Sequence, residues 1–374
     1  MFKNKRYLSL VLLLVFVAVI VAGCATAKPP AAPASGDGAK AEAPKQEVIK
    51  WKIATAWPKS IMIQQMPEKF AEEVNKASGG RLQVEVYPSG AVVGPAEVLD
   101  AANAKTIDGY HTFSGYWIGK MPAAPFFSSV PMFFEPFQHL VWVYEGGGLE
   151  LWQKMYDQAG YNIKVIPLGI QHPETLAWSN KPLAKLDDWK GLKYRTVGWW
   201  GEILREHGVA VTSLPAAELY PSLERGVLDA TEFSSPYNDS TLGFQEVTKY
   251  MTGPGMHQPS VLFYIGINKD SWNALPDDLK QLVETTARSV TLWSWSKDFN
   301  ESMKALDQFK AKGITQVKVD EATQKEFAET AYNYLEKKAK EQGGIFQEIW
   351  TSAKDFRKKF VDYEEFMMPV RVKY

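Results

Sequence analysis

The chain of 374 residues has few of the side chains that form disulfide bonds or bind metals, with one cysteine and five scattered histidines. A single cysteine forms no intramolecular disulfide, so packing must hold the folded part together. The histidines lack the spacing of a metal-ligand pair on one helix, and we interpret each as a packing or surface residue. They are His111, His139, His172, His207 and His257.

Catalytic signatures are missing as well. The sequence contains no Gly-x-Ser-x-Gly, His-Glu-x-x-His, Walker or Gly-x-Gly-x-x-Gly motif. Since active sites also assemble from distant residues, this absence argues against an enzyme without excluding one. The formal net charge is −1 and no long basic run occurs, which argues against a nucleic-acid partner. Beyond the N-terminus, no apolar run reaches the length of a membrane span.

The N-terminus has the order of an export signal. Lys3, Lys5 and Arg6 precede an almost wholly apolar stretch over 7–21, and Cys24 follows small residues. This pattern is typical of a bacterial lipobox, so we expect a signal peptide over 1–23 and a lipid on Cys24 rather than an uncleaved anchor. The Ala- and Pro-rich stretch 24–47 buries too little apolar surface to fold, which predicts a disordered tether outside the cytoplasmic membrane.

The rest of the chain predicts two α/β units. Alternating apolar residues predict strands over 51–55 and 81–87, and helical periodicity predicts a helix over 62–76 between them. This order favours a mostly parallel sheet with helices on its faces, and a similar pattern recurs further along. We also predict one helix over 137–158 and a long helix over 277–312. Two lobes with a cleft between them follow.

Arg195 is the first candidate binding residue. It ends a predicted buried strand, where a guanidinium must find an anion because an unpaired buried charge is very costly. Its planar fork matches a carboxylate through two parallel hydrogen bonds. The residues alone leave open whether that anion is a ligand or a structural Asp or Glu.

Glu232 is the second candidate, because it ends a short apolar strand just before Pro236 bends the chain. Side chains at such strand ends face the ligand crevice of open α/β sheets. The Glu232 carboxylate and the Phe233 carbonyl would suit a cation, unless Glu232 only pairs with Arg195. Aromatic residues are candidates for the pocket wall, and most of them are equally good core residues. They are Trp57, Tyr116, Trp117, Trp199 and Trp200.

Four longer strings resemble the DctP family of extracytoplasmic solute receptors, which serve tripartite ATP-independent periplasmic (TRAP) transporters. The similarity extends over nearly everything after the tether, and the last two strings are the most specific. The strings are SGGRL with VEVYP over 78–88, GGLELW over 147–152, LDDWKGLKYR over 186–195 and ELYPSLERGVLDATE over 218–232.

The resemblance implies an α/β clamshell of the periplasmic binding protein type, with two lobes and a long helix spanning both. It implies an organic acid ligand, with Arg195 at the position of the family's carboxylate-binding arginine, and delivery to the TRAP membrane subunits. The glycine-rich string and the Pro-Tyr-Asn-Asp string at 236–239, which holds Asn238, look most like the branch that binds 2-oxo acids and lactate. That branch holds its ligand partly through a cation, and Glu232 and Phe233 match two of its ligands.

The third cation ligand departs from the branch. A glutamine usually stands four residues before a tryptophan, but counting back from Trp178 gives Glu174, while Gln171 lies three positions earlier. Either residue would serve, and a glutamate favours calcium over sodium because it adds negative charge. The sequence leaves open whether a cation binds at all and which acid is the ligand.

These inferences combine into one prediction. We expect a lipid-anchored, periplasmic receptor that closes on a small 2-oxo or 2-hydroxy monocarboxylate, using Arg195, Trp57, Tyr116, Asn238 and either Glu174 or Gln171. The predicted lobes comprise 48–168 with about 258–290, and 169–257 with about 291–374. A sensor kinase partner, an exported enzyme, a structural lipoprotein and a homodimer remain alternatives or open points.

Overall fold

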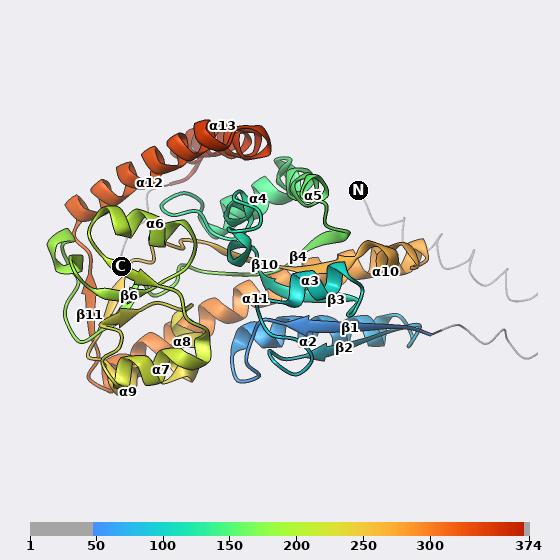
Figure 1. Ribbon diagram of the computed structural model, residues 1–374, viewed down its shortest axis with the longest axis horizontal. Coiled ribbons are helices and arrows are strands. Elements are labelled where there is room, and N and C mark those ends of the chain that lie inside the picture. The colour runs from blue at the N-terminus through green and yellow to red at the C-terminus, as the bar shows by residue number, and fades with distance from the viewer. Residues whose placement is uncertain (1–47, 370–374) are drawn as a thin grey trace, which may run out of the picture. The chain divides into compact units, whose positions relative to one another are not determined.

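The computed structural model describes residues 48–369, which form a mixed α/β body around two sheets (Figure 1). The predicted signal peptide over 1–23, the lipid on Cys24 and the tether over 24–47 lie outside the described residues. Among the helices of 48–369, none combines the length and apolarity that crossing a membrane requires.

The first sheet has the strand order β2-β1-β3-β10-β4. Strands β1, β2 and β3 run parallel, as the order of strands and helices predicted, whereas β10 runs antiparallel to both of its neighbours. Burial follows the alternation, since Leu82 and Val84 are buried and Glu85 is exposed. The strands are β1 (Ile49–Thr55), β2 (Leu82–Tyr87), β3 (Gly109–Phe113), β4 (Ile163–Gln171) and β10 (Val261–Asn268).

The second sheet has the order β11-β9-β5-β8-β6-β7 and is built from short strands. The strands are β5 (Ala177–Ser179), β6 (Lys193–Arg195), β7 (Ala210–Thr212), β8 (Ala230–Thr231), β9 (Tyr250–Gly253) and β11 (Thr315–Lys318). Strand β8 is shorter than the predicted strand, so Glu232 and Phe233 already lie in the loop that follows it.

Shorter helices flank both sheets. Those along the first sheet are α2 (Met62–Ala77), α3 (Val98–Asn103) and α10 (Lys269–Asn273), with the 3₁₀ turns η1 (Ser114–Trp117) and η2 (Ala124–Phe127). Those along the second are α6 (Gly198–Glu206), α7 (Ala216–Glu224), α8 (Pro236–Leu242) and α9 (Phe244–Val247), with η3 (Leu186–Trp189).

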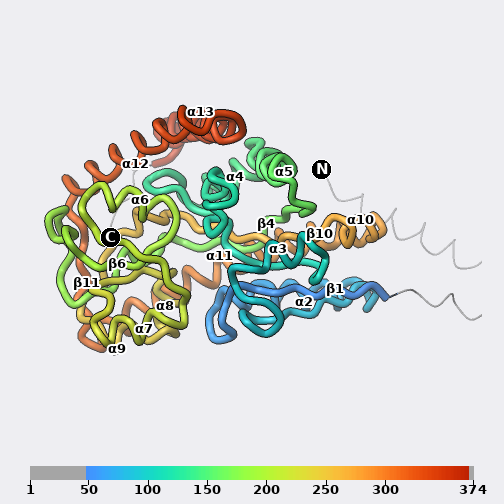
Figure 2. Tube along the Cα trace, viewed as in Figure 1, coloured from blue at the N-terminus to red at the C-terminus, as the bar shows by residue number. Residues whose placement is uncertain are grey.

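The long helix α11 (Asp277–Ala311) connects the two halves. It contacts β4 and α2 beside the first sheet and α8 beside the second, as its oblique path in Figures 1 and 2 shows. Its buried residues run from Leu279 to Phe309, so it packs over almost its whole length. The predicted long helix that spans both lobes is confirmed.

One predicted helix is wrong. Residues 137–158 form two helices, α4 (Pro136–Glu145) and α5 (Gly148–Gln158), because the glycines between them break the helix. Gly147 has a φ of 82°, a left-handed conformation that a glycine adopts without strain.

The chain ends in two further helices, α12 (Glu321–Gln342) and α13 (Gly344–Met367). Helix α12 contacts α6, and α13 folds back over α4 and α5, where Trp350 is fully buried (Figure 1). The C-terminal helices therefore touch elements beside both sheets. The predicted lobe boundaries remain a prediction.

Candidate functional site

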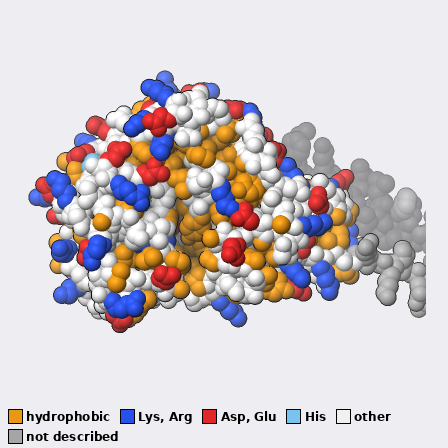
Figure 3. Space-filling view, in the orientation of Figure 1, with side chains coloured by type: hydrophobic (Ala, Val, Ile, Leu, Met, Phe, Trp, Pro, Cys, Tyr) orange, Lys and Arg blue, Asp and Glu red, His pale blue; other side chains and the backbone are white. Residues whose placement is uncertain are grey.

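A cavity of about 390 Å³ opens between the loops that follow strands of the two sheets. Trp57 follows β1 and Tyr116 lies in η1 after β3, while Arg195 ends β6 and Phe233 follows β8. Ligands of α/β folds bind at such strand ends. Figure 3 shows a hollow lined by hydrophobic side chains on this face of the molecule. The volume is within the range of small-molecule sites.

Arg195 reaches this cavity although only 2% of it is exposed. Its Nε donates to the Leu214 carbonyl, and its Nη1 donates to the carbonyl and to Oε1 of Glu232, each at 3.0 Å. The Phe233 ring lies 5.7 Å from Cζ. Arg195 therefore pairs with a structural acid and still lines the cavity, and its role toward a ligand remains a prediction.

Glu232 is completely buried and splits its two oxygens between different neighbours. Oε1 accepts from Arg195, whereas Oε2 has no hydrogen-bond partner among the described residues. Burial raises the pKa of Glu232, but the charge of Arg195 and the nearby imidazole of His257 outweigh burial and hold it below the usual range. Glu232 therefore stays ionised inside the protein.

Glu174 lies near Glu232, in the loop after β4. It is 5% exposed, and its Oε2 also lacks a partner within 48–369. Burial raises the pKa of Glu174 to about 8, although the adjacent His257 opposes the rise. The loop is held tightly, because a Cβ added at Gly255 would lie only 2.0 Å from the Glu174 carbonyl oxygen. Only glycine at position 255 leaves room for this backbone.

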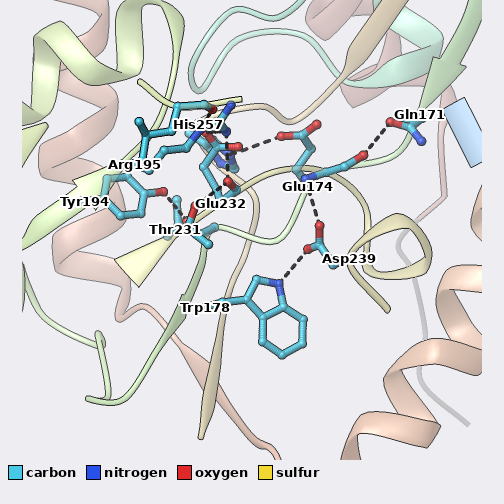
Figure 4. A network of polar contacts seen from close by, with 12 residues as sticks. Gln171, Glu174, Trp178, Tyr194, Arg195, Thr231, Glu232, Asp239 and His257 are labelled. Carbon is cyan, nitrogen blue, oxygen red and sulfur yellow. Dashed lines mark hydrogen bonds and ion pairs between the residues drawn. The ribbon is translucent and has the colours of Figure 1, made fainter. Parts of the chain in front are cut away.

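His257 completes the cluster and was missed by the sequence interpretation, which assigned every histidine to packing or the surface. Its Nε2 lies 3.5 Å from Glu174 Oε2 and 3.7 Å from Glu232 Oε2. Figure 4 shows the three side chains pointing toward one another. Neither ring nitrogen has a hydrogen-bond partner among the described residues. Burial disfavours the charged ring, but the two carboxylates outweigh burial and raise the pKa of His257 to about 9. No motif or spacing links these three distant positions.

A second, small cavity of about 20 Å³ shares part of its lining with the larger cavity. Glu174 lines it, and Trp57, Tyr116, Arg195 and Phe233 line both cavities. Its volume suits one water molecule or one ion. A water molecule or an ion beside Glu174 would therefore lie within reach of a ligand in the larger cavity.

Trp57 and Tyr116 form the wall that was predicted for the first lobe. Their ring centroids lie 6.1 Å apart, and Trp57 Nε1 donates to His111 Nδ1 at 2.8 Å. Burial raises the pKa of Tyr116 to about 12, so its hydroxyl stays protonated. Both rings face the cavity, and their contribution to binding remains a prediction.

Gln171 and Asn238 are not brought to the cavity. Gln171 donates to Asp298 at 3.2 Å and accepts from Ser234 at 3.1 Å, and it lies beyond Glu174 in Figure 4. Asn238 instead accepts from the Ile63 backbone, within a network around α8. Of the two predicted alternatives, Glu174 is the one whose side chain meets Glu232. The Phe233 ring lines the cavity, and a role for its carbonyl remains a prediction.

Residues 53–342 match the sequence profile of the DctP family, the bacterial extracellular solute-binding proteins of family 7. A monocarboxylate 2-oxoacid-binding periplasmic protein from Nostoc is 31% identical over 311 residues, or 83% of this chain and 85% of that protein. This chain belongs to the DctP family. The family consists of solute-binding receptors, so the predicted receptor class is confirmed.

Two solved TRAP periplasmic solute-binding proteins share the fold. The protein from Colwellia psychrerythraea, with calcium and pyruvate bound, has a TM-score of 0.81 and 26% identity, covering 86% of this chain and 98% of that chain. The protein from Pseudoalteromonas atlantica, with sodium and pyruvate bound, also has a TM-score of 0.81, with 25% identity and coverage of 86% and 97%. The predicted two-lobed α/β class is therefore confirmed, and this DctP-family chain is a TRAP solute-binding receptor.

Proposed function

We propose that this DctP-family receptor binds a small 2-oxo monocarboxylate together with a cation and delivers both to the TRAP membrane subunits. The observation that carries the proposal is that Arg195 and Glu174 line one small cavity, while Glu232 forms an ion pair with Arg195. The relative named for 2-oxoacid binding and the two pyruvate-bound structures support it.

Arg195 is proposed to hold the ligand carboxylate. Its Nε and Nη1 are already engaged, so Nη2 carries the N–H groups that remain for a ligand. The carboxylate would accept from Nη2 alone unless the Glu232 contact rearranges. The predicted pair of parallel hydrogen bonds from Arg195 to the ligand carboxylate therefore requires Glu232 to move away from Nη1, for example toward a cation.

The donor set at the cluster suits a cation. Glu174 and Glu232 each direct one buried oxygen without a partner toward the same space, and carboxylate oxygens are common ligands of metal cations. Once a cation displaces the protons of His257 and Glu174, one guanidinium and two carboxylates leave a negative charge, so a bound monocarboxylate needs the positive charge of that cation. The cation would supply that charge and polarise the ligand's keto oxygen.

The cavity walls favour a monocarboxylate ligand over a dicarboxylate. Among the described residues that line the larger cavity, Arg195 is the only basic one, and most of the others are apolar. A second carboxylate would lose its hydration without gaining a cationic partner. We therefore propose a 2-oxo acid with a short aliphatic side chain, which the faces of Trp57 and Phe233 would cover.

The direct test is calorimetry of the purified chain with 2-oxo monocarboxylates, 2-hydroxy monocarboxylates and C4-dicarboxylates in the presence of calcium. We expect a 2-oxo monocarboxylate to bind at least tenfold tighter than any dicarboxylate. Arg195→Lys should weaken it strongly, because an ammonium cannot replace the planar guanidinium. Mass spectrometry of the recovered acid should show no turnover. Equal affinity for dicarboxylates, or an unchanged Arg195→Lys variant, would contradict the proposal.

Closure and anchoring complete the proposal. We propose that the ligand bridges the two predicted lobes and closes them by a hinge motion, which small-angle scattering with and without ligand would detect. We also propose that Cys24 carries the lipid, on the support of the small residues before it and the Pro-rich stretch after it. Cys24→Ser should release the protein from the membrane fraction, and a protein still bound there would contradict the anchor.

A further inference from the structure

Three buried side-chain atoms face one another without a hydrogen bond. They are Glu174 Oε2, Glu232 Oε2 and His257 Nε2, which approach one another only as long ion pairs and have no hydrogen-bond partner among the residues of 48–369. Ligand atoms of the three residues all lie within 4.8 Å of one another. Buried polar atoms are rarely left unpaired in native proteins, so this convergence points to a missing partner.

The separations identify what kind of partner fits. The two carboxylate oxygens lie 3.5 and 3.7 Å from His257 Nε2, beyond the usual range of an N–H···O hydrogen bond. Two ligands on a tetrahedral ion with bonds of 2.0–2.2 Å stand about 3.3–3.6 Å apart. The cluster therefore has nearly the spacing of atoms that share one ion.

The imidazole sets the class of that ion. Calcium takes oxygen ligands, whereas an imidazole nitrogen suits zinc, copper, nickel and iron. His257 thus departs from an all-oxygen site of the kind that calcium or sodium prefers. Two carboxylates and one imidazole would leave coordination positions for further ligands, and Glu174 also lines the small cavity.

We propose that Glu174, Glu232 and His257 form a site for one divalent ion of the zinc and transition-metal class, at the wall of the ligand cavity. The inference rests on the proposed function, because this ion would be the cation that meets the 2-oxo acid. The carboxylate and keto oxygens of such an acid would fill two open positions on the ion.

The surroundings hold the three ligands in place. Arg195 Nη1 binds the other oxygen of Glu232 at 3.0 Å, which leaves Oε2 free to face His257. The Glu174 backbone donates to the Gln258 carbonyl at 3.2 Å and lies against Gly255. Residues 255–258 include His257 and also contact the backbone of Glu174. One segment therefore positions two of the three ligands. Such supporting contacts commonly change metal affinity by about 10–100-fold.

The test uses zinc and calcium for affinity and copper for spectroscopy on the purified full chain. We expect zinc to bind at one ion per chain and at least about tenfold tighter than calcium. With Cu²⁺ bound, pulsed electron paramagnetic resonance should detect one coordinated imidazole. His257→Gln should remove that nitrogen signal and the preference for zinc, whereas His172→Gln, which changes a half-buried histidine stacked on Trp295, should keep both.

A second variant guards against misfolding of the first. Glu174→Gln keeps His257, so the nitrogen signal should persist while zinc affinity falls at least tenfold. Circular dichroism checks that each variant is folded. A calcium preference in the unchanged chain, or a nitrogen signal that survives His257→Gln, overturns the inference but leaves 2-oxo acid binding intact. Failure to bind any 2-oxo acid with any ion would instead refute the proposed function.

Discussion

Two regions of the molecule treat a buried histidine in opposite ways. In the first sheet, His111 accepts from Trp57 Nε1 at 2.8 Å and its Nε2 donates to the Leu168 carbonyl at 2.9 Å, so the ring is neutral and fully paired. Burial lowers its pKa to about 4. Beside Glu174 and Glu232, His257 is equally buried, but neither nitrogen has a hydrogen-bond partner among the described residues and two carboxylates face it.

His139 repeats the pattern of the first region. It bonds the Phe126 carbonyl at 3.2 Å and Ser260 at 3.0 Å, and burial lowers its pKa to about 3. The comparison teaches that burial alone does not separate a packing histidine from a candidate ligand. What separates them is whether the surrounding groups complete the ring's hydrogen bonds or leave charged atoms facing it.

The largest effect is expected from breaking the ion pair beside the cavity. Arg195→Met leaves the Glu232 carboxylate buried without its cation, which should cost about 3–5 kcal/mol of unfolding free energy. Urea denaturation measures the loss. The double variant Arg195→Met with Glu232→Leu should recover most of it, because no buried charge remains. A single variant as stable as the original chain would show that the pair carries no such energy.

Acid titration should probe the first region. The unfolded chain protonates His111 and His139 below about pH 6.5, but the folded chain resists protonation until about pH 4 and about pH 3. The part of the stability that these two histidines control should therefore be full above pH 6.5 and fall as the pH drops, by roughly 3 kcal/mol for His111 by pH 4. His111→Gln should flatten this decline. Denaturation curves between pH 7 and pH 4 that keep the same slope in the variant would contradict the assignment.

A smaller effect is expected from moving one ligand of the cluster. The added Cβ of Gly255→Ala would collide with the Glu174 carbonyl, so the loop must shift, and cation affinity should fall at least tenfold. Gly253→Ala is the matched control, since a Cβ there meets nothing within 4 Å. Calorimetry with zinc and calcium compares the two. Equal cation affinities in the two variants would show that the Gly255 contact does not position the cation site.

The smallest effect should come from the link between the two regions. Trp57→Phe keeps an aromatic wall at the cavity but removes the donor to His111, at a cost of about 1 kcal/mol. Affinity for the 2-oxo acid should change less than fivefold. Thermal unfolding and calorimetry measure the two quantities on one sample. A large loss of affinity with unchanged stability would assign Trp57 to ligand binding rather than to support of the first sheet.

Helices and strands that depend on local residue patterns could be predicted from the sequence. Alternation gave β2, helical periodicity gave α2, and the strand ends placed Arg195 and Glu232 together. The helix predicted over 137–158 also ran through Gly147, whose left-handed backbone conformation the sequence did not reveal. Local signals were thus dependable for elements and less so for their ends.

The remaining site residues depend on tertiary contacts. Glu174, Glu232 and His257 come from three separate loops, and no spacing along the chain brings them together. Gln171 was an equal candidate until the fold directed its amide to Asp298 on α11. Only the three-dimensional arrangement distinguishes these residues.

The most direct test of the central claim is calorimetric titration of a 2-oxo monocarboxylate into the chain before and after removal of bound ions with a chelator. The account predicts that the chelated chain binds at least tenfold more weakly, that one equivalent of cation restores affinity, and that Glu232→Gln abolishes the restoration. Undiminished binding by the chelated chain would contradict a ligand held between Arg195 and a cation on Glu174 and Glu232.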